Sequence, residues 1–194
     1  MTVKKYLIKT CERKEIKTFI ETWHYSKNIN GVISDYSFKL IDKDQIIGAM
    51  IYGRIAMANV WKKYVNSENE LIELRRLCCI DDTPKNTESY FIGYTLRWLK
   101  KNSNIKKVIS YADETYNHSG TIYKASNFKH IGMTNKGKVI VYNNKLYHDK
   151  TIRTKYKGKL KPYCLKIKDA LNTGEAYYKN TLGKHIYIYQ LKNN

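Results

Sequence analysis

Long apolar runs, prolines and acidic side chains are all scarce in this sequence. No segment reaches the roughly 20 apolar residues that a membrane-spanning helix requires, so we expect no membrane partner. The charged stretch 1–17 lacks the apolar core of a signal peptide, which predicts a protein that stays in the cytoplasm. The four cysteines form no CxxC pair, which argues against a zinc knuckle or a disulfide framework and favours buried thiols.

The chain is short enough for one hydrophobic core. With 194 residues, only two prolines and no repeat or low-complexity linker, it predicts a single domain spanning 1–194. Any catalytic site must therefore be built on that domain.

Positive charge is the strongest signal in the composition. The sequence has 36 Lys and Arg against 17 Asp and Glu, a formal net charge of +19, which favours a polyanionic partner. The excess is uneven, because 136–168 carries eleven Lys or Arg against the single acid Asp149, with tyrosines interleaved. Phosphates and exposed bases bind such a mixture, so we expect a basic, Tyr-rich C-terminal part at about 136–194. A merely solvated basic face is the alternative.

Hydrophobic spacing predicts alternating strands and helices. Strands are expected at 3–9, 36–41, 45–52, 70–79, 107–111, 129–133, 138–142, 145–148 and 185–191, with hairpin turns around Asp42–Asp44 and at Asn143-Asn144. Helices are expected at 12–22, 88–101, 119–126 and 162–171. This order indicates an α/β or α+β protein built on a central sheet.

The segment Gly120-Thr121-Ile122-Tyr123-Lys124-Ala125-Ser126-Asn127-Phe128, followed by Ile131-Gly132, resembles the helix-to-strand segment of the GNAT acyltransferase superfamily. The preceding order of strand, helix and strand is similar to the GNAT core. The resemblance implies a mixed, largely antiparallel central sheet flanked by helices, with an acyl-CoA pyrophosphate at the N-terminus of helix 88–101. The loop 81–89 lacks the glycines usual in that superfamily, so either acyl-CoA or another group donor remains open.

A second, more specific resemblance spans His24 to the C-terminus. It rests on these segments in order: Trp23-His24-Tyr25-Ser26, Ile47-Gly48-Ala49-Met50-Ile51-Tyr52-Gly53-Arg54, Leu74-Arg75-Arg76-Leu77, Ser110-Tyr111-Ala112-Asp113, His118-Ser119-Gly120-Thr121-Ile122-Tyr123 and Gly183-Lys184-His185. Together they resemble the bacteriophage Mom family. The resemblance implies conversion of adenine in double-stranded DNA to N6-carbamoylmethyladenine, which protects phage DNA from host restriction. It also implies catalytic residues at His24, Tyr25, Asp113 and Tyr123, which would double as ligands of an iron cofactor, Fe(II).

These residue types suit such chemistry without the resemblance. Asp113 stands at the end of a predicted strand, the usual place for a functional side chain in sheet proteins. His, Asp and Tyr side chains can ligate a cation or share acid–base work on the adenine amino group. The sequence does not choose between these roles, and a His-Tyr pair after a helix is also compatible with a cap or a core polar group.

Further candidates surround this set. Arg76 alternates with apolar neighbours on a strand, so either Arg75 or Arg76 must point away from the buried residues, and we expect that one to face the site or DNA. The alternative is a surface Arg that only pairs with Glu73 or Glu70. Asn86 and Ser89 are candidates for holding a donor phosphate or, more simply, for capping the helix. His118 is a candidate substrate contact.

Two further groups would bind the nucleic acid. A flipped adenine would stack on exposed tyrosines, for which the candidates are Tyr25, Tyr36, Tyr52 and Tyr116. The DNA phosphates would be bound by the cations Lys150, Arg153, Lys155, Lys157, Lys159 and Lys161.

Two rival functions fit parts of the pattern. A GNAT N-acetyltransferase using acetyl-CoA on a small amine or a protein needs the fold but not the charge. A nucleic-acid-binding protein without enzymatic activity needs the charge but no donor site. Acetyl-CoA turnover without DNA would identify the first, and full biological activity after Asp113→Ala the second.

Overall fold

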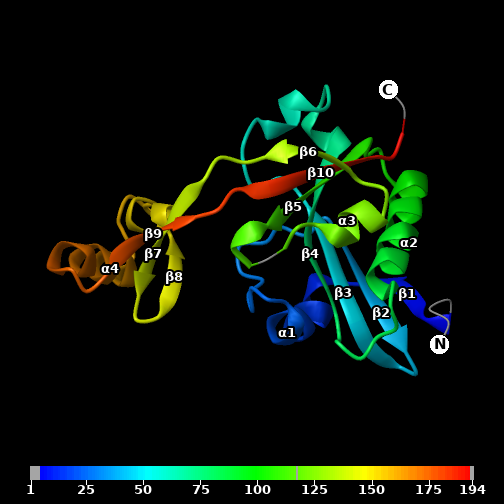
Figure 1. Ribbon diagram of the computed structural model, residues 1–194, viewed down its shortest axis with the longest axis horizontal. Coiled ribbons are helices and arrows are strands. Elements are labelled where there is room, and N and C mark those ends of the chain that lie inside the picture. The colour runs from blue at the N-terminus through cyan, green and yellow to red at the C-terminus, as the bar shows by residue number, and fades with distance from the viewer. Residues whose placement is uncertain (1–4, 117, 193–194) are drawn as a thin grey trace. The chain divides into compact units, whose positions relative to one another are not determined.

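The chain forms two compact units in the computed structural model, which describes residues 5–116 and 118–192 (Figure 1). The larger unit runs up to Ala112 and continues in Gly120–Gly132 and from His185 onward, whereas the smaller unit holds Asp113–Ser119 and Met133–Lys184. The strands are β1 (Leu7–Thr10), β2 (Tyr36–Asp42), β3 (Gln45–Gly53), β4 (Leu71–Cys79), β5 (Lys107–Asp113), β6 (Lys129–Met133), β7 (Gly137–Tyr142), β8 (Lys145–His148), β9 (Tyr177–Thr181) and β10 (Lys184–Gln190). The helices are α1 (Arg13–Trp23), α2 (Thr87–Asn102), α3 (Thr121–Ala125) and α4 (Pro162–Thr173), with short 3-10 turns η2 (Val60–Lys63), η3 (Glu68–Glu70), η4 (Glu114–Tyr116) and η5 (Asp149–Ile152).

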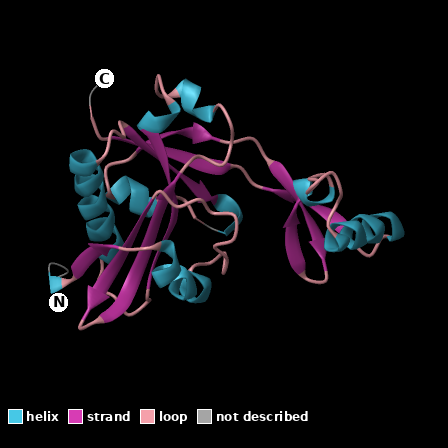
Figure 2. Ribbon diagram, turned by 180° about the vertical axis from the view of Figure 1, so that it is seen from behind, coloured by secondary structure: helices cyan, strands magenta, loops and turns pink. Residues whose placement is uncertain are grey.

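A seven-stranded sheet in the order β1-β2-β3-β4-β5-β10-β6 forms the centre of the larger unit. The pairs β1–β2, β2–β3 and β3–β4 are antiparallel, and β4 pairs with β5 in parallel. The predicted fold class, a largely antiparallel central sheet flanked by helices, is therefore confirmed (Figure 2).

The two faces of this sheet are covered by different helices, because successive strand residues point to opposite sides. Met50 and Tyr52 of β3 belong to the core cluster that includes Phe91 and other residues of α2. Ala49 and Ile51 belong to the cluster that includes Ile16 and Ile20 of α1. Helix α1 begins with a reciprocal capping box between Glu12 and Glu15, which satisfies backbone donors at its first turn.

The smaller unit is a three-stranded antiparallel sheet, β8-β7-β9, with α4 against one face (Figure 2). Ile140 of β7 packs with Ile167 and Ala170 of α4. Helix α4 has Pro162 at its start and ends at Gly174, whose φ of 83° closes the helix in the left-handed conformation.

Most predicted elements are present with ends shifted by a few residues. The first predicted strand begins outside the described residues, and β1 starts at Leu7. Asn143 and Asn144 have φ of 48° and 57°, which confirms the predicted two-residue hairpin turn. Strand β9 was missed, because its sequence Tyr-Tyr-Lys-Asn-Thr shows no apolar alternation.

The positive part of the sequence falls mainly in the smaller unit. Residues 136–184 of the predicted basic part belong to that unit, whereas 185–194 return to the larger one. Among the described residues, no helix has both the length and the hydrophobicity needed to cross a bilayer.

Candidate functional site

Strands β4 and β5 pair over only part of their length. The parallel register covers Leu71–Glu73 and Lys107–Ile109 and then stops, although both strands continue. Just beyond this point, the Ser110 hydroxyl donates a hydrogen bond to the Leu74 carbonyl at 3.2 Å. The carboxyl ends of adjacent parallel strands are the usual place for a ligand site in a sheet protein.

Side chains from four elements of the larger unit lie within electrostatic range of one another near these strand ends. They are Tyr25 after α1, Glu73 and Arg76 on β4, Ser110 on β5 and Tyr123 on α3, and we call them the strand-end cluster. Burial raises the pKa of Tyr123 to about 12, although its hydrogen bond with Ser110 opposes the shift, and the charges of Tyr25 and Glu73 add to it. Tyr123 is therefore a neutral phenol at neutral pH. The structure thus brings Tyr25 and Tyr123, two predicted site residues, into one electrostatic neighbourhood.

Arg76 is positioned by an irregularity in β4. Its partner on β3 is Ile51, whereas Tyr52 pairs with Leu74, so Arg75 is an extra residue that bulges out of the ladder. Strict alternation therefore fails here and does not say which arginine points away from the buried set, whereas the predicted alternative, an Arg paired with Glu73, is found for Arg75 at 3.7 Å. Arg76 Nε donates to the carbonyl of Asn28 at 3.2 Å. The pKa of Arg76 is lowered, and burial is the largest of several contributions to this shift. Arg75 instead donates to the Arg54 carbonyl at 2.7 Å.

His24 is held by the turn that ends α1. It is only 5% exposed, and its Nδ1 accepts a hydrogen bond from the Ser26 backbone N–H at 3.1 Å. Since Nδ1 is an acceptor, the neutral ring carries its proton on Nε2. The ring lies 4.3 Å from that of Tyr25 between centroids, so each orients the other.

Asp113, the last residue of β5, is an ion-paired carboxylate. Its Oδ2 lies 2.9 Å from Lys184 Nζ, and its Oδ1 accepts from the Thr115 N–H at 3.1 Å. Burial raises the pKa of Asp113, but the hydrogen bond and charge of Lys184 and the bonds from Thr115 outweigh it, so the pKa is lowered. Asp113 and Lys184 both belong to the smaller unit, whereas His24, Tyr25 and Tyr123 belong to the larger one.

The donor types of the four predicted residues fit iron. One imidazole nitrogen, two phenolic oxygens and a carboxylate are nitrogen and oxygen donors of the kind that bind iron in proteins. With Nδ1 accepting from the Ser26 N–H, His24 would bind a metal through Nε2 only after that nitrogen had lost its proton, so this hydrogen bond opposes binding by the neutral ring. In the described part of the chain, no group of three or more His, Cys, Asp or Glu side chains could hold a metal, so the two phenols would be essential ligands.

A model of the Mom protein family matches residues 5–194. The chain belongs to the Mom protein family. One relative, the methylcarbamoylase mom of Escherichia phage Mu, is 29% identical over 146 residues, which cover 73% of this chain and 59% of the relative. The chain thus spans under two thirds of that relative's length.

Solved structures with the same fold are acetyltransferases. An N-acetyltransferase from Staphylococcus aureus Mu50 superposes with a TM-score of 0.53 at 15% identity, covering 96% of this chain and 99% of that one. Arabidopsis thaliana NAA60 in complex with acetyl-CoA gives a TM-score of 0.55 at 9% identity, covering 95% of this chain and 98% of that one. At such identities the likeness establishes that the Mom family chain has the GNAT fold.

The loop before α2 differs from an anion-binding turn. Asp81, Asp82 and Glu88 place three carboxylates near the helix N-terminus, against one cation, Lys85. The Thr87 N–H already donates to the Pro84 carbonyl at 3.2 Å.

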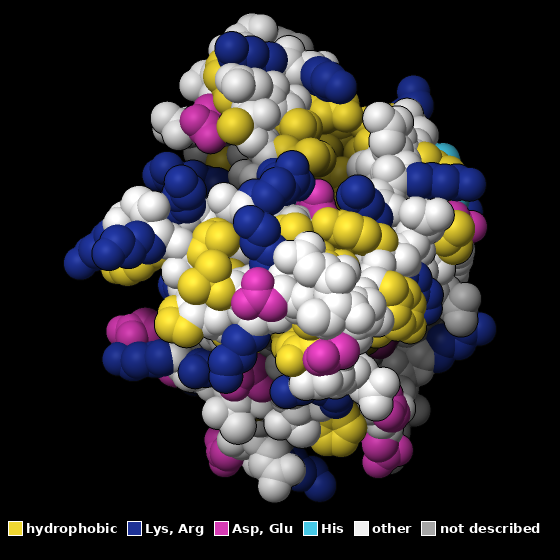
Figure 3. All heavy atoms as spheres, turned by 90° about the vertical axis from the view of Figure 1, so that its left-hand side faces the viewer, with side chains coloured by type: hydrophobic (Ala, Val, Ile, Leu, Met, Phe, Trp, Pro, Cys, Tyr) yellow, Lys and Arg dark blue, Asp and Glu magenta, His cyan; other side chains and the backbone are white. Residues whose placement is uncertain are grey.

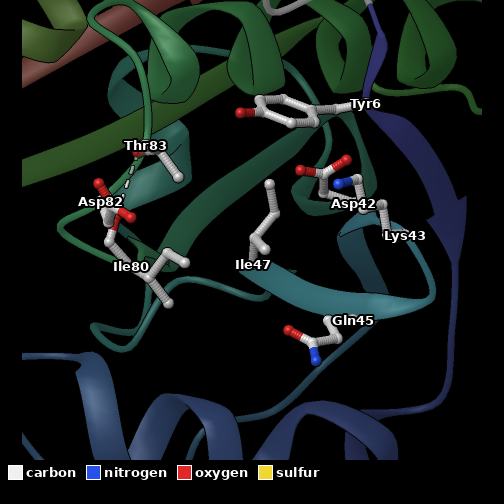
Figure 4. A pocket seen from close by; sticks show the side chains of 8 residues that line it. All are labelled: Tyr6, Asp42, Lys43, Gln45, Ile47, Ile80, Asp82 and Thr83. Atoms are coloured by element: carbon white, nitrogen blue, oxygen red, sulfur yellow. Dashed lines mark hydrogen bonds between the residues drawn. The ribbon is translucent and has the colours of Figure 1, made fainter.

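A cavity of about 260 Å³ lies beside this loop, between it and the β2–β3 turn. Figure 4 shows Asp82 and Thr83 on one side of it and Asp42 and Lys43 on the other, with Tyr6 and Ile47 between. Two carboxylates, those of Asp42 and Asp82, line this cavity against the single cation Lys43.

The two predicted capping residues behave differently from the expectation. Asn86 occupies the N-cap position of α2, but its φ is 72° and its side chain makes no cap hydrogen bond. The Ser89 hydroxyl donates to the Asn86 carbonyl at 3.0 Å instead of capping a backbone donor. His118 is exposed, and its N–H donates to the Asp113 carbonyl at 3.3 Å.

The prediction that four tyrosines could stack on a base is wrong for one of them. Tyr52 is fully buried, and its hydroxyl is 2.8 Å from that of Thr95, so it is a core residue that no base can reach. Tyr36 packs edge-on against Trp98 at 5.6 Å. Tyr25 and Tyr116 are 45% and 44% exposed.

All six predicted phosphate-binding cations are exposed and lie in the smaller unit. They follow β8 and run through η5 to the residue before α4. Residues 133–184 carry thirteen Lys or Arg against three Asp or Glu, a net charge of +10 out of +19 for the chain. The space-filling view of one face shows Lys and Arg in dark blue among hydrophobic and aromatic side chains in yellow (Figure 3).

The site residues that sequence reasoning missed are Glu73, Ser110 and Lys184. Ser110 and Lys184 stand in segments that carry the Mom family resemblance, so a residue-by-residue inspection of those segments could have found them. The sequence contained no such signal for Glu73, because a pairing of Glu73 with Arg75, which the structure has at 3.7 Å, is an ordinary contact between residues of one strand.

Proposed function

We propose that this Mom family chain is a transferase that places a carbamoylmethyl group on N6 of adenine in double-stranded DNA, and so protects phage DNA from restriction. The name of the phage Mu relative, a methylcarbamoylase, supports the type of group transferred. Transfer replaces one N6–H bond by an N6–C bond while the bond between the carbamoylmethyl carbon and its donor breaks, so the site must hold the adenine, receive a proton and release the donor's leaving group with the bonding electrons.

One observation supports this proposal above others: the chain combines a GNAT-type sheet bearing the strand-end cluster with a separate unit of strong positive charge. An acetyltransferase of small amines needs the sheet but gains nothing from thirteen cations in one unit. Phosphate binding by Lys and Arg is the main sequence-independent contribution to DNA affinity.

The adenine must leave the base stack before its amino group can react. Tyr25, 45% exposed and stacked on His24, offers a ring face at the strand ends on which the base can lie. The neutral phenol of Tyr123 can donate a hydrogen bond to a ring nitrogen of adenine. Asp113, kept ionised by Lys184, is an acceptor for an N6 proton, although its lowered pKa makes it a weak base.

Iron belongs to the proposal as a metal that His24, Tyr25 and Tyr123 of the larger unit would bind, in which case Tyr123 would bind as a phenolate and would no longer donate to adenine. Held there, iron would supply a Lewis acid close to the reacting groups. Because Lys184 already pairs with Asp113, a cation bound by that carboxylate would compete with the ammonium group.

We propose that the group donor is not a CoA thioester. The carboxylates of Asp81, Asp82 and Glu88 would repel a pyrophosphate at the N-terminus of α2. Incubation of the purified protein with acetyl-CoA and amines should therefore give no turnover. Release of CoA without DNA would favour the N-acetyltransferase function instead.

Nucleoside mass spectrometry of DNA from cells expressing the protein tests the reaction. We expect N6-carbamoylmethyl-deoxyadenosine with the wild type and its loss with Tyr123→Phe and Asp113→Asn, which preserve shape. Lys5→Met, which removes an exposed cation of the larger unit paired with Asp42, is the matched control and should retain modification. Unmodified deoxyadenosine in wild-type cells refutes the proposal, and full biological protection by Asp113→Asn would favour a non-enzymatic DNA-binding protein.

A further inference from the structure

A tight turn projects from the smaller unit at Tyr156–Lys159. The Tyr156 N–H donates to the Lys159 carbonyl at 2.8 Å, and the Lys159 N–H donates back to Tyr156 at 3.2 Å. Lys157 and Gly158 have φ of 50° and 79°. Two central residues with positive φ define a type I′ turn, the rigid two-residue connection of β-hairpins.

The residue at the first central position is unusual for such a turn. Asn, Asp and Gly adopt positive φ readily, whereas a Lys there is strained. The β7–β8 turn of the same unit follows the usual preference with Asn143-Asn144. Lys43 in the β2–β3 turn of the larger unit also has positive φ, at 46°, so the strain alone assigns no role, and the role of Lys157 depends on the ring beside it.

An aromatic ring stands beside this charge. Tyr156 is 61% exposed, and the Nζ atoms of Lys157 and Lys161 lie 5.8 and 5.2 Å from its ring centroid. Two ammonium groups therefore lie close to one exposed aromatic ring. The exposed lysines at 155, 157, 159 and 161 alternate with other residues along the turn, which spaces cations beside the ring.

We propose that this turn is a nucleobase-binding element: the Tyr156 ring stacks on an unpaired base, while Lys157, Lys159 and Lys161 bind the phosphates on either side of it. The inference rests on the proposed function in taking DNA as the partner. A base within an intact duplex has both faces covered by its neighbours, so the ring suits a base that is unpaired or displaced. An acidic peptide would use the lysines but leaves an exposed aromatic face without a partner of its own.

Binding of the full chain to two fluorescent duplexes tests the stacking. One duplex is fully paired, and the other carries a single unpaired base. We expect the wild type to prefer the second, and Tyr156→Ala to lose roughly 5- to 150-fold in affinity for it, as stacking measured by alanine substitution predicts. Affinity for the paired duplex should hardly change. Tyr156→Phe should keep the preference, and so should Tyr177→Ala, which removes an equally exposed tyrosine of the same unit, 60% exposed.

The salt dependence of binding tests the phosphate contacts. Lys157→Asn places a residue that tolerates positive φ at the strained position, so the turn is kept while a charge is lost. The slope of log affinity against log salt should fall by about 0.9. Lys43→Asn is the matched control, because Lys43 has φ of 46° in the β2–β3 turn of the larger unit, and it should leave the slope unchanged.

The outcomes separate this inference from the proposed function. If the wild type binds DNA but Tyr156→Ala keeps the preference for the unpaired base, the stacking role is wrong and the proposed function stands. An equal loss in Tyr177→Ala, or an equal change of slope in Lys43→Asn, also overturns it. A wild-type chain that binds neither duplex overturns both.

Discussion

Replacing Gly120 by Ala should destabilise the larger unit through two separable effects. Gly120 has φ of 77°, and an added Cβ would stand 2.2 Å from Cε2 of Tyr187, which is fully buried. Left-handed backbone costs a non-glycine residue about 1–2 kcal/mol. Forcing a methyl group into a packed core costs a further ~1–3 kcal/mol, because the atoms that it meets belong to a fully buried ring. The total of roughly 2–5 kcal/mol corresponds to a fall in melting temperature of about 4–20 °C for a chain of this length.

Gly31 offers a control that isolates the backbone effect. It also lies in the larger unit with φ of 72°, but nothing lies within 4 Å of an added Cβ. Gly31→Ala should therefore cost only the backbone strain, about 1–2 kcal/mol. Thermal unfolding followed by circular dichroism measures both variants. Equal losses for Gly120→Ala and Gly31→Ala would refute the argument that Tyr187 blocks the position.

The Gly120 substitution should also reach the site. Tyr187 lies 5.3 Å from Tyr123 between ring centroids, so a displaced Tyr187 presses on a residue of the strand-end cluster. Adding Tyr187→Leu, which removes the clashing ring atoms, should recover part of the stability lost in Gly120→Ala, giving a coupling of about 0.5–3 kcal/mol in a double-mutant cycle. Strict additivity would show that the two residues do not interact.

Three further predictions concern buried polar groups and the metal. Because the pKa of Asp113 is lower in the folded than in the unfolded chain, its ion pair stabilises the fold at pH values above the unfolded-state pKa, and this stabilisation is lost as the pH falls through the folded-state pKa. Lys184→Met should therefore shift acid unfolding, followed by circular dichroism, to higher pH. An unchanged midpoint would contradict the ion pair. Thr95→Val should lower the free energy of unfolding in urea by about 1–3 kcal/mol, because the buried Tyr52 hydroxyl loses its hydrogen-bond partner. Thr95→Ser keeps a hydroxyl there and should retain the stability. Equal losses in the two variants would point to packing instead. Metal analysis of the purified chain should find iron that falls in Tyr123→Phe, and the same iron content in both proteins would remove Tyr123 from the ligand set.

The fold was largely predictable because local patterns and tertiary packing agree. The apolar spacing of α1 and α2 matches the faces they bury, and the Asn-Asn turn fixes the β7–β8 hairpin. Strand β9 was not predicted because its stability comes from pairing with β7, and its own residues do not alternate between apolar and polar. Tyr52 was misjudged for a related reason: a tyrosine on a central strand is buried when Thr95 supplies its hydroxyl with a partner, and that partner is 43 residues away.

The site was harder to predict because its geometry depends on departures from regular structure. The bulge at Arg75 breaks the strict alternation of β4 at both arginines, and the hydrophobic periodicity of the sequence does not predict it. The pairing of Asp113 with Lys184 joins residues 71 positions apart, so its effect on the pKa of the carboxylate is a property of the fold. Chemical type was readable from the sequence, whereas protonation state was not.

The separation of the chain into two units implies that binding and chemistry respond to different changes. Phosphate contacts in the smaller unit contribute through charge, so added salt should weaken DNA binding by the wild type and diminish the effect of removing Lys157 or Lys159. The strand-end cluster acts through buried hydrogen bonds such as that between Tyr123 and Ser110, which salt screens far less. Substitutions of the phosphate-binding lysines of the smaller unit, such as Lys157 and Lys159, should therefore raise the DNA concentration needed for modification without changing the rate at saturation. Tyr123→Phe should lower the rate at saturation whatever the salt concentration.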